Sequence, residues 1–131
     1  PYQATRNVCV TVPYTVTDQH GASSTANLVI TLTGTNDAPV VTGAVSGAAT
    51  EDGAGVTLDA RANASDLDQD TTLSVVDVPS TLPAGVTYDA ATQSFTLDPS
   101  DAAYQSLARG ASTTVTVSYS VTDGIATVPA T

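Results

Sequence analysis

Short acidic clusters are spaced along a chain that is otherwise rich in Val, Thr and Ala. Four of them could do chemistry: Asn36-Asp37, Glu51-Asp52, the Asp-Leu-Asp-Gln-Asp stretch Asp66–Asp70, and Asp123 with an earlier copy at Asp18. Aspartate is a turn residue and a ligand of hard cations. Alternating Asp-x-Asp in an extended loop points successive carboxylates to the same side, as chelation requires. The pattern therefore suggests a cation site built from loops.

Two other interpretations of the Asp66–Asp70 stretch stay open. It could be a solvated turn without a metal, and the same holds for the Asn36-Asp37 pair and for Asp123. It also resembles the start of an EF-hand loop, in which Asp77 would take the twelfth position. However, Thr71 stands where that loop needs glycine, and no flanking helices are expected.

The rest of the composition narrows the classes of function. The 131 residues carry a formal net charge of −10 with only three Lys and Arg, which disfavours a protein that tracks nucleic-acid phosphates. Apolar runs are short, so no membrane-spanning segment is expected. A single cysteine, Cys9, and a single histidine, His20, cannot supply a disulfide framework, a cysteine zinc site or the usual nucleophile–base pairs. We expect no enzyme.

An internal repeat sets the layout of the chain. Val10–Asp18 returns as Val115–Asp123, with seven of nine residues identical at a spacing of 105. A period of about 100 residues is typical of one β-sandwich domain. The sequence therefore starts late in one repeat and stops late in the next. We assign 1–35 to the last strands of a preceding repeat, 36–39 to a linker, and 40–131 to a second repeat.

Alternation of apolar residues predicts an all-β fold. Val8–Val16 and Ala26–Leu32 form a hairpin in which Tyr14 faces a core, as does its repeat equivalent Tyr119. Further strands are expected near 40–45, 56–60, 73–78, 86–88, 95–97 and 113–121. Ser100 is expected to cap one helical turn.

The second repeat stops before its counterpart of Ala26–Thr33. We therefore expect a sandwich without its final strand, which leaves an exposed edge. Ala26–Thr33, from the same or another molecule, is our candidate to fill it by strand exchange.

Sandwich topology indicates which clusters can meet. The linker pair, the Asp66–Asp70 loop and the loop at Asp123 should lie at one end of the second repeat, whereas Glu51-Asp52 should lie at the other. Carboxylates gathered in this way repel one another unless a cation neutralises them. Calcium, which takes six to eight oxygen ligands, is the usual one. The ligands predicted at this end are Asn36, Asp37, Asp66, Asp68, Asp70 and Asp123.

Three motifs resemble a known family. Gly-Thr-Asn36-Asp37-Ala-Pro, Asp66-x-Asp68 and Tyr-x-Val-Thr-Asp123-Gly look like the VCBS and cadherin-like repeats of large bacterial surface adhesins and RTX-type secreted proteins. The resemblance implies an immunoglobulin/cadherin-like Greek-key β-sandwich in a tandem array, with Ca²⁺ at the junctions. It also implies that Glu51 faces the next junction as a further ligand. The linker is shorter than that of animal cadherins, which implies fewer ions per junction.

The functional expectation follows from this resemblance. The chain is expected to be a structural extender repeat, stiffened by calcium and contacting adjacent repeats of the same polypeptide. Its parent would be an adhesin that serves cell adhesion and biofilm formation, extracellular or on the cell surface after type I secretion. The alternative is a module that binds carbohydrate or a host protein, but six aromatic residues and no Trp offer little for a sugar platform.

Overall fold

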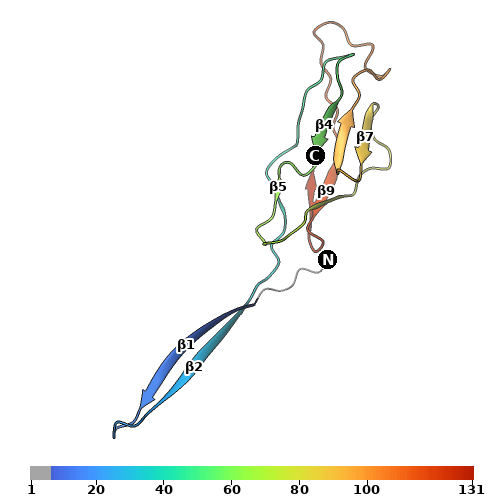
Figure 1. Ribbon diagram of the computed structural model, residues 1–131. Coiled ribbons are helices and arrows are strands. Elements are labelled where there is room, and N and C mark those ends of the chain that lie inside the picture. The colour runs from blue at the N-terminus through green and yellow to red at the C-terminus, as the bar shows by residue number, and fades with distance from the viewer. Residues whose placement is uncertain (1–6) are drawn as a thin grey trace. The chain divides into compact units, whose positions relative to one another are not determined.

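The computed structural model describes residues 7–131, and in that part of the chain it contains strands and turns but no helix (Figure 1). Consequently, no helix within 7–131 is long and apolar enough to cross a membrane. The chain divides into two compact units, Pro1–Asn36 (unit 1) and Asp37–Thr131 (unit 2). The all-β prediction is confirmed.

Unit 1 is one long antiparallel hairpin. β1 (Asn7–Thr17) pairs with β2 (Ser23–Thr33) over the whole length of both strands. The predicted alternation is present, because Val8, Val10, Val12, Tyr14 and Val16 share one face with Leu32, Ile30, Leu28 and Ala26. That face is not covered: Tyr14 is 48% exposed, so the prediction that it lies in a core is wrong within the described chain.

Unit 2 is a β-sandwich of short antiparallel strands. One three-stranded sheet consists of β6 (Ser74–Val76), β9 (Tyr119–Thr122) and β10 (Thr127–Ala130), in the order β10-β9-β6. The other consists of β4 (Val56–Asp59), β8 (Ser94–Leu97) and β7 (Val86–Asp89), in the order β4-β8-β7. A two-residue ladder joins β3 (Val40–Val41) to β5 (Ala64–Ser65).

The core of unit 2 forms around β9. Tyr119 is 5% exposed and Val121 is fully buried, as their inward parity predicts. The Phe95 ring lies between those of Tyr119 and Tyr88, with centroid separations of 5.2 and 4.8 Å. Tilted arrangements of this kind are favourable between aromatic rings, and these contacts connect the two sheets.

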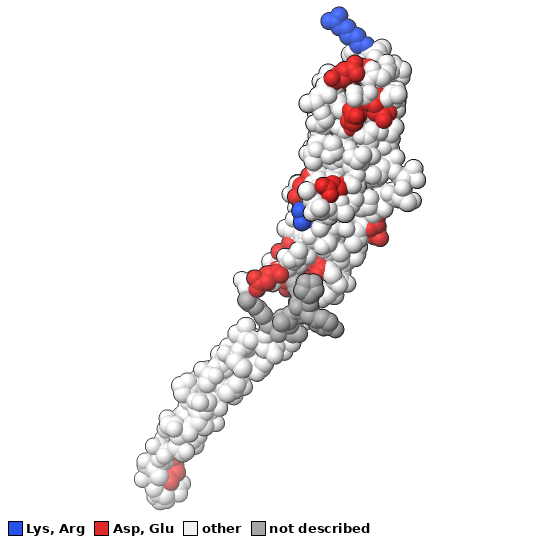
Figure 2. Space-filling view, turned by 45° about the vertical axis from the view of Figure 1, so that its right-hand side comes forward, with Lys and Arg blue, Asp and Glu red and all other residues white. Residues whose placement is uncertain are grey.

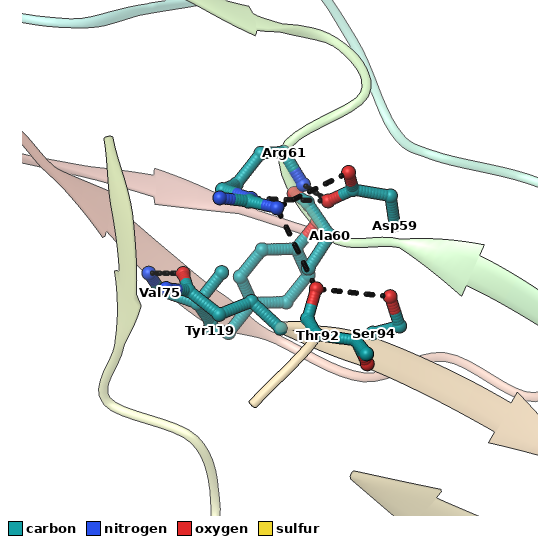
Figure 3. A network of polar contacts seen from close by, with 8 residues as sticks. Asp59, Ala60, Arg61, Val75, Thr92, Ser94 and Tyr119 are labelled. Atoms are coloured by element: carbon teal, nitrogen blue, oxygen red, sulfur yellow. Dashed lines mark hydrogen bonds and ion pairs between the residues drawn. The ribbon is translucent and has the colours of Figure 1, made fainter. Parts of the chain in front are cut away.

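Polar contacts join the sheets beside this core (Figure 3). The Tyr119 hydroxyl donates to the carbonyl oxygen of Ala60 at 2.7 Å. The backbone N–H of Val75 donates to Oε1 of Gln93 at 2.7 Å, across from one sheet to the other. Burial raises the pKa of the Tyr119 hydroxyl, and the nearby charge of Asp59 adds to the effect.

Three sequence expectations need correction. The strand expected at 113–121 is assigned only from Tyr119, and the residues before it have no ladder partner. The helical turn expected after Ser100 is instead a run of turns in which the N–H groups of Tyr104 and Leu107 donate three residues back. Asp98 rather than Ser100 accepts the local bond that begins this segment. Finally, unit 2 does have a last strand, β10, although it is only four residues long.

Candidate metal site

Strand pairing brings three of the predicted acidic segments to one end of unit 2. Val40, the first residue of β3, is opposite Ser65, so the segment beginning at Asp37 adjoins the loop that begins at Asp66. Ser74, the first residue of β6, is opposite Thr122, so this loop and the β9–β10 hairpin lie at the same end. The predicted grouping of Asp37, Asp66–Asp70 and Asp123 at one end is confirmed at the level of loops.

A direct contact ties two of these segments together. The backbone N–H of Asp37 donates to Oδ2 of Asp68 at 2.8 Å. The backbone N–H of Asp68 in turn donates to Oδ1 of Asp66 at 2.8 Å. Sequence reasoning placed Asp37 and Asp68 at the same site but gave no signal that a main-chain N–H would hold the Asp68 carboxylate.

Asp66 carries the one buried orphan atom in the described part of the chain. Its Oδ2 is shielded from solvent and has no hydrogen-bond partner within residues 7–131. A buried carboxylate oxygen without a partner is costly, whereas a bound cation would satisfy it. An unpartnered carboxylate oxygen is the kind of donor that a hard cation such as Ca²⁺ prefers.

The other predicted ligands at this end have the following positions. Asp70 adopts a left-handed backbone with φ of 65°, which aspartate tolerates better than most residues. Asp123 Oδ1 accepts the N–H groups of Ile125 and Ala126, both at 2.6 Å, within the β9–β10 turn. Asn36 is the last residue of unit 1, and its part in the site stays a prediction. In residues 7–131, no three His, Cys, Asp or Glu side chains are grouped closely enough to hold a metal ion.

Glu51 and Asp52 precede β4, and the backbone N–H of Asp52 donates to the carbonyl oxygen of Pro99, just beyond the end of β8. β4 begins beside this end of β8, and Figure 1 shows β4 beginning at the end of unit 2 away from the β9–β10 turn. The Asp52 carboxylate accepts a hydrogen bond from Nε2 of Gln105 at 2.9 Å. The structure therefore does not bring Glu51 together with the other predicted ligands, and its role at a different junction stays a prediction. Figure 2 shows acidic side chains at both ends of unit 2.

Most aspartates also accept hydrogen bonds from nearby backbone N–H groups. Seven of them accept a hydrogen bond from the backbone N–H two residues later, as Asp66 does from Asp68: Asp18, Asp59, Asp66, Asp89, Asp98, Asp101 and Asp123. Such bonds are typical of aspartate in turns. They lower the pKa of exposed Asp89, mainly through the N–H of Ala91, and of Asp98, through the hydroxyl and N–H of Ser100. Four of these residues, Asp59, Asp89, Asp98 and Asp101, are outside the predicted ligand set and bond within local turns.

Comparison with known proteins agrees with this architecture. The sequence profile of the cadherin-like domain matches residues 35–131, which is most of the chain. No curated protein and no solved structure matched. The matched region contains all of unit 2 and begins just before the linker pair. The chain thus belongs to the cadherin-like domain family.

Proposed function

We propose that this chain is a structural extender repeat of a large secreted or cell-surface bacterial adhesin, stiffened by calcium where repeats join. Membership in the cadherin-like family indicates an extracellular repeat related to adhesion. The finer assignment, including cell adhesion, biofilm formation, type I secretion and the absence of catalysis, is our proposal. It is supported by the motifs at the linker and by the acidic loops at one end of unit 2.

The observation that carries the calcium proposal is the orphan Oδ2 of Asp66 beside the bond from Asp37 to Asp68. Asp37 belongs to the segment that enters unit 2, and Asp66 and Asp68 belong to a loop of its sandwich. In residues 7–131 no three of these carboxylates are close enough to hold a metal ion. A cation bound at Asp66 would therefore have to draw Asp68, Asp70 and Asp123, with Asn36 and Asp37 from the linker, toward it, and would neutralise the carboxylate charges. It would also restrict the orientations that the linker can adopt.

Exposed apolar side chains at the same end support contact with an adjacent repeat. Leu67, between Asp66 and Asp68, is 81% exposed, and Ile125, in the β9–β10 turn, is 66% exposed. Apolar side chains that flank charged ligands would become buried when a neighbouring repeat closes on the junction. Calcium and apolar contact would then act together, with the ion setting the orientation.

Calorimetry on the 131-residue chain tests this proposal. Extracellular modules bind calcium with Kd near 10⁻⁴–10⁻³ M. At a calcium concentration about 100 times Kd, ligand linkage predicts about 2.7 kcal/mol of stabilisation. For a unit of this size, that raises the Tm by roughly 10 °C or more. Magnesium at the same concentration is the control for ionic strength, and equal melting in EDTA and calcium would refute the calcium proposal.

A further inference from the structure

β6 is the outermost strand of its sheet in the described residues, and its backbone register shows which of its groups face the open side. Pro129 has no N–H, so the pair Ser120–Pro129 is of the kind without mutual hydrogen bonds, and Ser120 directs its N–H and C=O toward β6. Ser120 is opposite Val76. Because these directions alternate along a strand, Val75 directs its N–H and C=O away from β9, to the open edge of the sheet.

A side chain from the other sheet occupies the outward N–H of Val75. Oε1 of Gln93 accepts this N–H at 2.7 Å, and the carbonyl oxygen of Gln93 accepts the N–H of Ala60 at 3.1 Å, just beyond the β4–β8 ladder. The Gln93 backbone is left-handed, with φ of 54°, which is uncommon for a residue with a side chain. Strain of this kind persists where the surrounding structure requires one particular geometry. Here it accompanies a side chain that extends across the sandwich to one N–H.

The chain beyond Val75 is unsuited to lengthening the edge. β6 ends at Val76, and the next outward position, Asp77, has a left-handed backbone with φ of 55° and an exposed side chain. Pro79, two residues further on, has no N–H. Short strands, charged side chains and prolines are features by which natural proteins keep sheet edges from pairing. Within β6, the outward N–H of Val75 is thus the donor left for an added strand, and Gln93 is the residue that occupies it.

Without the bond to Gln93, this edge would match itself. Two copies of β6 could lie antiparallel with their Val75 residues opposite one another, each donating its N–H to the carbonyl oxygen of the other. The side chain of Val75 packs against the core, which holds the outward N–H at the edge of each copy. The contact would be isologous, because both copies use the same edge. An unpaired edge of this kind is a template for another strand.

We propose that Gln93 caps the open edge of β6 and thereby keeps unit 2 of one molecule from pairing with unit 2 of a second copy. Any strand that added to this edge would first have to displace the Gln93 side chain from Val75. Edge pairing needs only two copies of unit 2, so the cap acts in the free chain, whatever the wider role of the protein. It would matter most in the tandem array proposed above, because neighbouring repeats are prone to misassembly.

Amide hydrogen exchange tests whether Gln93 holds the Val75 N–H. Gln93→Asn is one methylene too short to reach it, yet asparagine tolerates a left-handed backbone and adds no apolar surface. Gln93→Glu keeps the length and an acceptor oxygen. At low protein concentration, NMR should show the Val75 N–H exchanging roughly tenfold faster or more in Gln93→Asn, and within about threefold of the unmodified rate in Gln93→Glu. The N–H of Val121, which faces β10, is the internal reference and should not change.

Sedimentation of the 131-residue chain over a range of concentrations tests the consequence. Gln93→Asn should associate roughly tenfold more tightly than the unmodified chain, or more. Gln105→Asn is the matched control, because the Gln105 side chain also links two segments but bonds to Asp52 and Ser100, away from β6. It should leave association within about twofold. Adding Val75→Pro to Gln93→Asn removes the outward N–H, which an edge position tolerates, and should return association to the unmodified level.

Exchange at rising concentration locates the contact without relying on Val75→Pro. In the Gln93→Asn chain, pairing at β6 should restore slow exchange of the Val75 N–H as association proceeds. Association with that N–H still exchanging fast would place the contact elsewhere and overturn the proposal. Faster exchange in dilute solution with no tighter association would overturn it as well, because the uncapped edge would then not recruit a second copy. So would an unchanged exchange rate in Gln93→Asn, since Gln93 would then not hold this N–H in solution.

Discussion

The backbone N–H of Asp37 and the Oδ2 atom of Asp68, 31 residues apart in the chain, are 2.8 Å from one another. This bond fixes the segment that enters unit 2 against the loop that carries Asp66. It occupies one carboxylate oxygen of the loop while the neighbouring Oδ2 of Asp66 stays buried without a partner in residues 7–131. The loop is therefore hydrogen-bonded to the linker, but it carries a buried carboxylate oxygen that has no partner. A bound cation would remove the energetic cost of burying that oxygen.

Asp66→Asn should have opposite effects without and with calcium. The substitution keeps Oδ1 as acceptor for the Asp68 N–H but removes the charge from the orphan atom. In EDTA, the free energy of unfolding should stay equal or rise by up to about 1 kcal/mol, because burying an unpaired charge is costly. In calcium, the gain in the free energy of unfolding should fall to less than half of the gain that calcium gives the unmodified chain. Denaturant titrations in both conditions measure the two effects.

Asp98→Asn is the matched control. Asp98 is exposed and also caps a local turn, but it lies beyond β8, at the end of the sheet where β4 begins. Calcium should raise the free energy of unfolding of this variant as much as it raises that of the unmodified chain. If Asp66→Asn and Asp98→Asn respond alike, the calcium effect is one of general charge and not of the Asp66 loop.

The sequence predicted which side chains face the core better than it predicted where strands pair. Alternation assigned Tyr119 and Val121 to the interior, and both are buried. The same alternation predicted a strand from Thr113, yet the ladder begins only at Tyr119. Side-chain parity depends on the chain itself, whereas a ladder needs a partner strand beside it, and β10 reaches only as far as Ala130.

Loop contacts set a second limit. Topology was enough to place the Asp37, Asp66–Asp70 and Asp123 segments at one end of unit 2. It could not show that Asp68 accepts a main-chain N–H, because that bond depends on the local turn of its own loop. Nor did any pattern single out Gln93, whose left-handed backbone (φ 54°) accompanies a side chain that reaches Val75 in the other sheet.

Tyr119→Phe should destabilise unit 2 by about 1–2 kcal/mol. The variant keeps the ring contact with Phe95 but leaves the carbonyl oxygen of Ala60, which is 3% exposed, without its hydroxyl donor. An unsatisfied buried acceptor costs about 1–3 kcal/mol. Tyr88→Phe, whose ring also stacks on Phe95, is the control and should cost less than half as much. Equal losses in urea titrations would show that the bond to Ala60 contributes nothing specific.

Acid should weaken unit 2 in part through Asp59. The N–H of Arg61 lowers the pKa of this carboxyl below its ordinary value of 3.8. Burial partly opposes this effect, and the guanidinium, 3.2 Å away, lowers the pKa further. A carboxyl with a lowered pKa in the folded state stabilises the fold above the unfolded value. That contribution is lost as the pH falls below 3.8 and through the folded pKa. The side chain of Asp59 is 49% exposed, so solvent screening keeps the effect small.

Melting temperatures between about pH 2 and pH 6 should therefore fall less steeply for Asp59→Asn than for the unmodified chain. An identical slope in the two proteins would mean that other carboxylates, such as Asp89 and Asp98, carry the acid sensitivity.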